Sequence, residues 1–196
     1  MTSNNKTLIP LAFIGIMFFA IGFALGINSL LVPVLQSSLN ISNAASYLII
    51  AATFIPFLLF GYPAGLTIKA IGYKKTMSVS FFIFAVAFYL FILSANDGSF
   101  TLFLLASFVS GAGNAYLQAS VNPYITILGP LESAAKRISI MGICNKLAWP
   151  IPSIFIVWLI GKDVNKIGIS DLEYPFLIII LAFVILGIMA FFAPLP

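Results

Sequence analysis

The sequence predicts an all-α membrane protein in which residues 1–196 form one bundle of six transmembrane helices. Hydrophobic residues make up 62% of the chain and charged residues only 7%, whereas a soluble domain averages about 45–50% and about 25%. The apolar residues also fall into segments of about 20 residues or more, the length that crosses a bilayer. Polar turns separate these segments, and none is long enough to hold a soluble domain.

The charged and reactive residues exclude several classes of function. The chain has no histidine and one cysteine, Cys144, so it cannot build a His-based catalytic dyad, a His metal site or an intrachain disulfide. All of its acidic residues lie in expected loops, so we expect no metal site, no cofactor and no enzymatic activity. Its basic residues are spread over short loops, without the patch that a nucleic-acid binder presents.

Two helices are expected in the uncharged stretch from Thr7 to Ile68, at residues 8–35 and 44–70. This stretch is too long for one span, and residues 36–43 contain Ser and Asn, which favour turns and helix caps. The first helix exceeds the ~7–15-residue apolar core of a signal peptide and has no cleavage site after it. We therefore expect it to stay in the membrane.

Four further helices follow turn signals along the rest of the chain. Asn96-Asp97-Gly98 ends the third helix and Gly129-Pro130 ends the fourth. Because the loops are short, neighbouring helices are expected to pack antiparallel. The four helices are expected at residues 76–95, 100–128, 138–160 and 174–193.

The distribution of Lys and Arg over the loops predicts the orientation. One set of loops holds Lys6, Lys69, Lys74, Lys75, Lys136 and Arg137, and the opposite set holds only Lys162 and Lys166. Cytoplasmic loops carry the excess of basic residues. We therefore expect both termini in the cytoplasm of a bacterial cell, with the bundle in its inner membrane.

The fourth predicted helix carries an amide stripe at membrane depth. Asn114, Gln118 and Asn122 are four residues apart, so they lie on one helix face. Polar residues in the membrane are costly and usually functional, and amides offer the paired donors and acceptors that sugar hydroxyls need. Two interpretations remain open: a polar cavity, or hydrogen bonds that hold helices together beside the small-residue row Gly111, Ala115 and Ala119.

A similar pattern occurs in the first and fourth predicted helices. Asn28 precedes Pro33 by five residues, and Gln118 precedes Pro123 by the same distance. These two helices are expected to run in opposite directions across the membrane. The pattern suggests an inverted repeat of three plus three helices, an arrangement common in transporters.

The fifth predicted helix places a lysine deep in the membrane. Lys146 follows Arg137 by nine residues, which is roughly 13–14 Å along a helix. We expect it to be either close to the middle of the bilayer or able to reach the interface by snorkelling. Asn145 and Trp149, four residues apart, could face one cavity. The candidate substrate-binding residues are therefore Asn28, Asn114, Gln118, Asn122, Asn145 and Trp149, with Lys146 and Arg137 as coupling or structural charges.

Three motifs resemble a known transporter family. Gly65-Leu-Thr-Ile-Lys-Ala-Ile-Gly-Tyr-Lys-Lys75 resembles the signature between helices two and three of the major facilitator superfamily, with Lys69 where an Asp is usual. Leu117–Pro130 resembles the fourth-helix motif of its fucose–galactose–glucose:proton symporter family. Ser133–Lys146 resembles the fifth-helix motif of the bacterial glucose/galactose branch.

This resemblance implies a hexose transporter and assigns roles to single positions. Ser29 and Gln118 stand where the fucose branch has its proton-titrating Asp and Glu, and Asn145 matches an Asn that contacts sugar. Gln118 is usual in the glucose/galactose branch, so glucose or galactose fits better than fucose. Because Ser29 and Gln118 do not titrate, the coupling ion remains open between a proton, Na⁺ and none.

The family has twelve helices in two halves, so the resemblance implies that this chain is an amino-terminal half. The expected partners are a hexose, the lipid bilayer and a second six-helix half, with no nucleic acid. Ala193-Pro-Leu-Pro196 lies where the central loop would begin. The alternative functions are a membrane assembly or scaffold protein without transport, and an inactive fragment.

Overall fold

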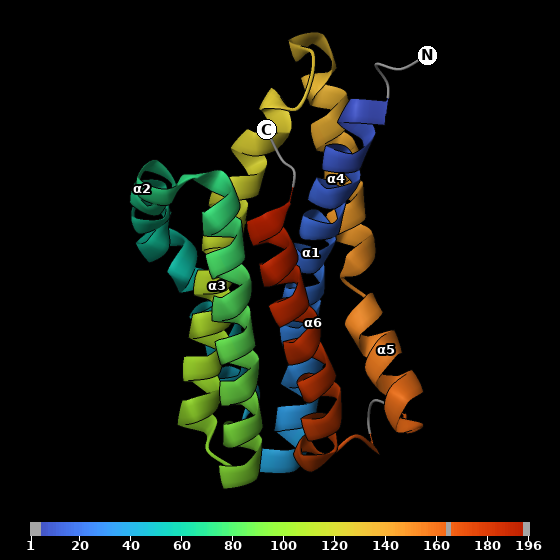
Figure 1. The fold of residues 1–196 in the computed structure, drawn as a ribbon. Coiled ribbons are helices and arrows are strands. Elements are labelled where there is room, and N and C mark those ends of the chain that lie inside the picture. The colour runs from blue at the N-terminus through green and yellow to red at the C-terminus, as the bar shows by residue number, and fades with distance from the viewer. Residues whose placement is uncertain (1–4, 164–165, 194–196) are drawn as a thin grey trace.

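The computed structural model describes residues 5–163 and 166–193, with side chains from Pro10 onward. Every regular element in these ranges is helical, which gives the predicted all-α fold (Figure 1). Five segments are long and apolar enough to cross a membrane. The elements are α1 (Asn5–Leu39), α2 (Asn43–Asp97), α3 (Phe100–Ile127), η1 (Leu131–Ser133), α4 (Ala134–Ala148), α5 (Ile151–Ile160), η3 (Ile169–Leu172) and α6 (Glu173–Phe192).

Helix α2 covers the region where the sequence predicts two helices, at 44–70 and 76–95. It contains 55 residues, or roughly 80 Å at 1.5 Å per residue, far more than a bilayer core of about 30 Å. Gly72 interrupts it with φ 82° and ψ 168°, a conformation open to glycine and rarely to other residues. In Figure 1 the ribbon of α2 turns back on itself at the upper left of the view, so its two arms run in opposite directions.

The predicted helix at 138–160 is broken into two helices. Helix α4 already begins at Ala134 and ends at Ala148, and α5 begins at Ile151. Pro150 and Pro152 have no backbone N–H to donate to the preceding turn, so the helical hydrogen bonds lapse there. The break lies directly after Asn145, Lys146 and Trp149, and α5 also packs on α1 beyond it.

A cluster of phenylalanine rings holds together α3, α6 and the arm of α2 that follows Gly72. Phe84 and Phe183 stack with ring centroids 5.0 Å apart, and Phe91 and Phe103 lie 4.7 Å apart. Ser78 Oγ donates a 2.7 Å hydrogen bond to the Gly187 carbonyl, which links α2 to α6. The rest of the bundle, α1 with α4 and α5, packs against this cluster mainly through α1 and α3.

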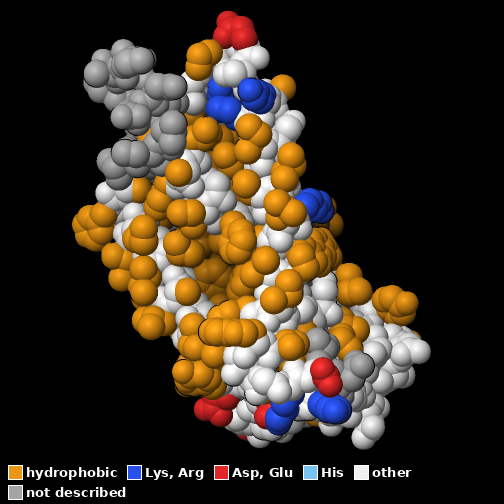
Figure 2. All heavy atoms as spheres, turned by 90° about the vertical axis from the view of Figure 1, so that its right-hand side faces the viewer, with side chains coloured by type: hydrophobic (Ala, Val, Ile, Leu, Met, Phe, Trp, Pro, Cys, Tyr) orange, Lys and Arg blue, Asp and Glu red, His pale blue; other side chains and the backbone are white. Residues whose placement is uncertain are grey.

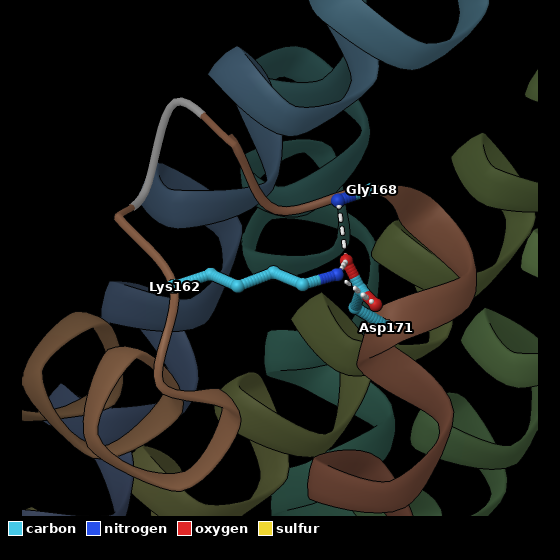
Figure 3. A network of polar contacts seen from close by, with 3 residues as sticks. All are labelled: Lys162, Gly168 and Asp171. Atoms are coloured by element: carbon cyan, nitrogen blue, oxygen red, sulfur yellow. Dashed lines mark hydrogen bonds and ion pairs between the residues drawn. The ribbon is translucent and has the colours of Figure 1, made fainter.

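Charged side chains lie mostly at the two ends of the molecule, with a broad hydrophobic band between them (Figure 2). At one end Lys162 binds both carboxylate oxygens of Asp171 at 2.8 Å, and the Gly168 N–H donates to the same carboxylate (Figure 3). This contact fixes the turn before α6. The side chain of Lys6 and the chain end at Pro196, both used in the sequence predictions, lie outside the described residues.

Candidate substrate-binding site

A polar cavity lies where α1, α3 and α4 meet. It has a volume of about 150 Å³, and four of its seven lining residues are polar. Gln118 and Asn122 reach it from α3, and Asn145 and Lys146 reach it from α4. Phe18, Ile21 and Gly142 complete its wall. The structure thus brings together two pairs of candidate residues that are distant in the sequence. The amide stripe indicated Gln118 and Asn122, and the fifth predicted helix supplied Asn145 and Lys146.

Two glycines allow α1 to approach α4 closely enough to form this cavity. A Cβ at Gly22 would overlap the carbonyl oxygen of Asn145 and lie 2.8 Å from its carbonyl carbon. A Cβ at Gly26 would overlap the carbonyl of Trp149 in the same way. Asn145 Nδ2 donates a 3.1 Å hydrogen bond to the carbonyl of Phe18 across this contact. The Asn145 amide is therefore part helix contact and part cavity wall.

Asn28 and Trp149 line a second cavity, of about 280 Å³, on the other side of the α1–α4 contact. Trp149 Nε1 donates to Ser29 Oγ at 3.2 Å, and this bond holds the indole ring against α1. Thr53 from α2 also lines the cavity. The Trp149 indole forms an aromatic wall of this cavity, and the Asn28 amide adds a polar group from α1.

Asn114 lies in neither cavity. Its side chain is fully buried, and its Nδ2 and Oδ1 atoms have no hydrogen-bond partner in the described part of the chain. Ser107 and Ser110, seven and four residues before it, are buried without partners as well, and these spacings put all three on one face of α3. Asn28 Oδ1 is a further buried oxygen of this kind.

Helices α2 and α3 approach each other closely beside this stripe. A Cβ at Gly111, next to the stripe on α3, would overlap the Thr53 carbonyl on α2. Thr53 also shares a cavity with Asn28. Each unpartnered buried group costs about 1–3 kcal/mol. The α1–α2–α3 junction is thus a polar, energetically costly region beside the amide-lined cavity. Sequence analysis missed Thr53 and Ser107, although the stripe spacing pointed to Ser107.

Lys146 has no acidic partner among the described residues. Its Nζ lies 5.2 Å from the centroid of the Trp149 ring, a cation–π contact. The two ion pairs of the described chain, Lys162–Asp171 and Lys166–Asp163, lie in the turn between α5 and α6. The ammonium group is exposed at the cavity, so its charge is available to a ligand or to another segment.

Arg137 has a different role from Lys146. It is buried, and its guanidinium donates to the carbonyls of Ile125, Thr126 and Pro130 at 2.9–3.2 Å, and also to Ser133 Oγ. Ile125 and Thr126 belong to the last turn of α3, where backbone carbonyls lack partners and favour a cation. The geometry makes Arg137 the C-terminal cap of α3 and places it outside the cavity.

Replacing Arg137 by methionine is expected to destabilise the fold strongly. The change would leave the last carbonyls of α3 without donors, and hydrogen bonds to a charged group contribute about 1.5–3 kcal/mol each. Thermal unfolding in detergent measures the effect. Lys136→Met is the matched control, because Lys136 is exposed on the same helix. Equal melting temperatures for the two variants would contradict the capping role.

Two further hollows among the described residues are apolar. One of about 290 Å³ lies between α1, α5 and α6, and its lining includes Phe23, Phe155 and Phe183. Another of about 590 Å³ lies between α1 and α4, beside Met141 and Cys144. Neither holds an amide, hydroxyl or charged side chain, so neither offers hydrogen bonds to a polar solute.

Comparison with known proteins agrees with this arrangement of helices. Residues 12–196 match the Major Facilitator Superfamily. The chain belongs to the major facilitator superfamily. A protein named glucose/galactose transporter from Brucella abortus biovar 1 (strain 9-941) is 33% identical over 192 residues, which are 95% of this chain and 47% of that protein. A protein named L-fucose-proton symporter from Escherichia coli (strain K12) is 29% identical over 161 residues, 82% of this chain and 37% of that protein.

A solved structure shows the same fold. The crystal structure of the major facilitator superfamily transporter FucP in the outward conformation superposes with a TM-score of 0.80 at 24% identity, over 97% of this chain and 50% of that one. The chain therefore spans about half the length of the relatives it matches. The predicted superfamily and symporter family are confirmed, and an integral membrane protein follows. The matched relatives are named as transporters, which agrees with the prediction of a non-enzyme.

Proposed function

We propose that this chain is the amino-terminal half of an ion-coupled transporter for glucose or galactose that works by alternating access. The observation that carries the proposal is the amide-lined cavity of Gln118, Asn122 and Asn145 at the meeting of α1, α3 and α4. Its volume of about 150 Å³ is below the ~300–1,000 Å³ of a complete ligand pocket. A site shared with a second half accounts for the difference.

The wider proposal follows the transporter architecture of the superfamily. The proposed architecture has six passes in a 3+3 inverted repeat. The division of α2 into two arms at Gly72 supports it, as do Pro33 in α1 and Pro123 in α3. Lys69, Lys74 and Lys75 flank the bend of α2. The positive-inside rule then puts this end, and both termini, on the cytoplasmic side of the inner membrane. The coupling ion is a proton or Na⁺.

A second candidate function is a membrane assembly protein in which amides only hold helices together. Two observations favour it: the Asn145 side chain bonds to the Phe18 carbonyl, and Trp149 bonds to Ser29. Under this hypothesis the loss of an amide lowers stability, and no sugar changes the result. Under the transport hypothesis, sugar raises the melting temperature because a ligand that binds only the folded state stabilises it.

Gln118→Ala is expected to abolish the sugar-dependent rise in melting temperature and to reduce sugar uptake sharply. Gln118 lines the cavity, and its amide forms no hydrogen bond with another residue of the described chain. The melting temperature without sugar should therefore hardly change. The measurements are thermal unfolding in detergent with and without galactose or glucose, and uptake by cells that express the full-length protein.

Gln36→Ala is the matched control. The Gln36 amide bonds to Asn43 Oδ1 and Ser46 Oγ in the turn between α1 and α2, far from the cavity. Its loss should lower the melting temperature slightly and leave the sugar-dependent rise intact. A Gln118→Ala variant with normal uptake would remove Gln118 from the site, and the absence of any sugar effect on the unmodified protein would favour the assembly hypothesis.

A further inference from the structure

Lys146 gives the amide cavity a positive charge that a neutral hexose does not need. The lining residues are three amides, one ammonium group, two apolar side chains and a glycine. Phe18 and Ile21 of α1 face Lys146, and Gln118 and Asn122 of α3 face it from the other side. None of these four side chains ionises. Within the described chain the field at the cavity is therefore that of a single uncompensated cation.

No acidic residue of the described chain forms an ion pair with Lys146. Glu132 lies in η1, ahead of α4, and Lys146 is in the last turn of α4, roughly 20 Å away at 1.5 Å per residue. Asp163 and Asp171 pair with Lys166 and Lys162 in the turn between α5 and α6. Lys146 is exposed in the described chain, so an anionic ligand can reach its ammonium group directly.

We propose that this cavity also binds, beside glucose or galactose, a hexose that carries a carboxylate, such as a hexuronate, with the carboxylate on Lys146 Nζ. This inference rests on the proposed transport function and adds a second substrate class to the same site. One ammonium group matches one carboxylate in charge. The amides of Gln118, Asn122 and Asn145 supply donors and acceptors for the ring hydroxyls, and the Trp149 ring already holds the ammonium in place from the other side.

The test compares galacturonate with its methyl ester and with galactose. The acid and its ester have the same ring and differ only at the C6 group, where the ester has a methyl group in place of the negative charge. The protein is extracted into detergent from the membrane of its own host. The binding of each compound is then measured by the rise in melting temperature over a range of concentrations. A charge-assisted hydrogen bond contributes about 1.5–3 kcal/mol, so galacturonate should bind about tenfold to hundredfold more tightly than the ester.

Variants of Lys146 locate the effect. Lys146→Met should bring galacturonate down to the affinity of the ester, whereas Lys146→Arg should retain the preference for the acid because it retains the charge. Lys136→Met makes the same chemical change at an exposed position of the same helix and should change neither affinity. The comparison of acid with ester on the unmodified protein holds even where a variant fails to fold.

The outcomes separate this inference from the proposed function. If galactose stabilises the protein and galacturonate binds no better than its ester, the carboxylate site is wrong and the hexose transporter stands. If no sugar of either kind stabilises it, both proposals fail. If galacturonate is preferred equally by the unmodified protein and by Lys146→Met, the carboxylate binds elsewhere and the inference is overturned.

Discussion

Replacing Gly22 by alanine is expected to push α1 away from α4 and to destroy the amide-lined cavity. The added methyl group would overlap the Asn145 carbonyl oxygen and lie 3.0 Å from the Cβ of Ala148. Overpacking a buried contact costs about 1–3 kcal/mol when side chains can adjust. Here the obstructing atoms belong to the backbone of α4, so the cost should reach at least the upper end of this range.

The expected results are a large fall in melting temperature and the loss of sugar-dependent stabilisation. Both follow from one displacement, because the hydrogen bond from Asn145 to the Phe18 carbonyl crosses the same contact. Gly26→Ala should behave like Gly22→Ala, since a Cβ at Gly26 would meet the carbonyl of Trp149. The measurement is thermal unfolding in detergent, with and without sugar.

Gly15→Ala is the matched control on the same face of α1. Gly15 precedes Gly22 by seven residues, two helical turns. A Cβ added at Gly15 would lie 3.7 Å from Met141 Sδ, an ordinary contact with a flexible side chain. In a helix interior, alanine is favoured over glycine by about 0.5–1 kcal/mol. Gly15→Ala should therefore keep or raise the melting temperature. A Gly22→Ala protein as stable as Gly15→Ala would show that α1 and α4 are not packed as closely as the structure has them.

The fold was predictable because hydropathy and turn residues determine where membrane helices start and stop. The helices near residues 8–35, 100–128 and 174–193 correspond to α1, α3 and α6 within a few residues. The differences occur where tertiary geometry decides. A single residue, Gly72, serves as the whole connection between two helices, and the consequence of Pro150 and Pro152 depends on whether α4 needs to continue its packing on α1.

The candidate site was predictable in its residues and only partly in its grouping. Four-residue spacing put Gln118 and Asn122 on one face, and the structure adds Asn145 and Lys146 to the same cavity. Spacing alone could not separate Asn114 from this set, since all three amides share the stripe. The distinction comes from neighbouring helices: α2 covers Asn114 through the close approach at Gly111, whereas Gln118 lies where α1 and α4 leave a space. Contacts of this kind between distant segments leave no local pattern in a sequence.

Replacing Asn114 by leucine is expected to raise the stability of the fold, whereas replacing Gly22 by alanine is expected to lower it. Leucine has the same branching at Cγ as asparagine, and Asn114→Leu replaces two buried atoms without partners by methyl groups. An unsatisfied buried polar group costs about 1–3 kcal/mol, and its replacement by an apolar group of similar shape removes that cost. The melting temperature without sugar is therefore expected to rise.

Asn145→Leu is the contrasting variant. Its amide holds the Phe18 carbonyl at 3.1 Å, so its loss should lower the melting temperature, and the same chemical change then has opposite signs at two positions. Asn114 is one of the candidate substrate-binding residues. If it contacts sugar during transport, Asn114→Leu should lose uptake while it gains stability. A protein that retains its polar residue at such a cost is exchanging stability for function. A fall in melting temperature for Asn114→Leu would instead mean that water satisfies this amide, and the α1–α2–α3 junction would then be a hydrated structural contact.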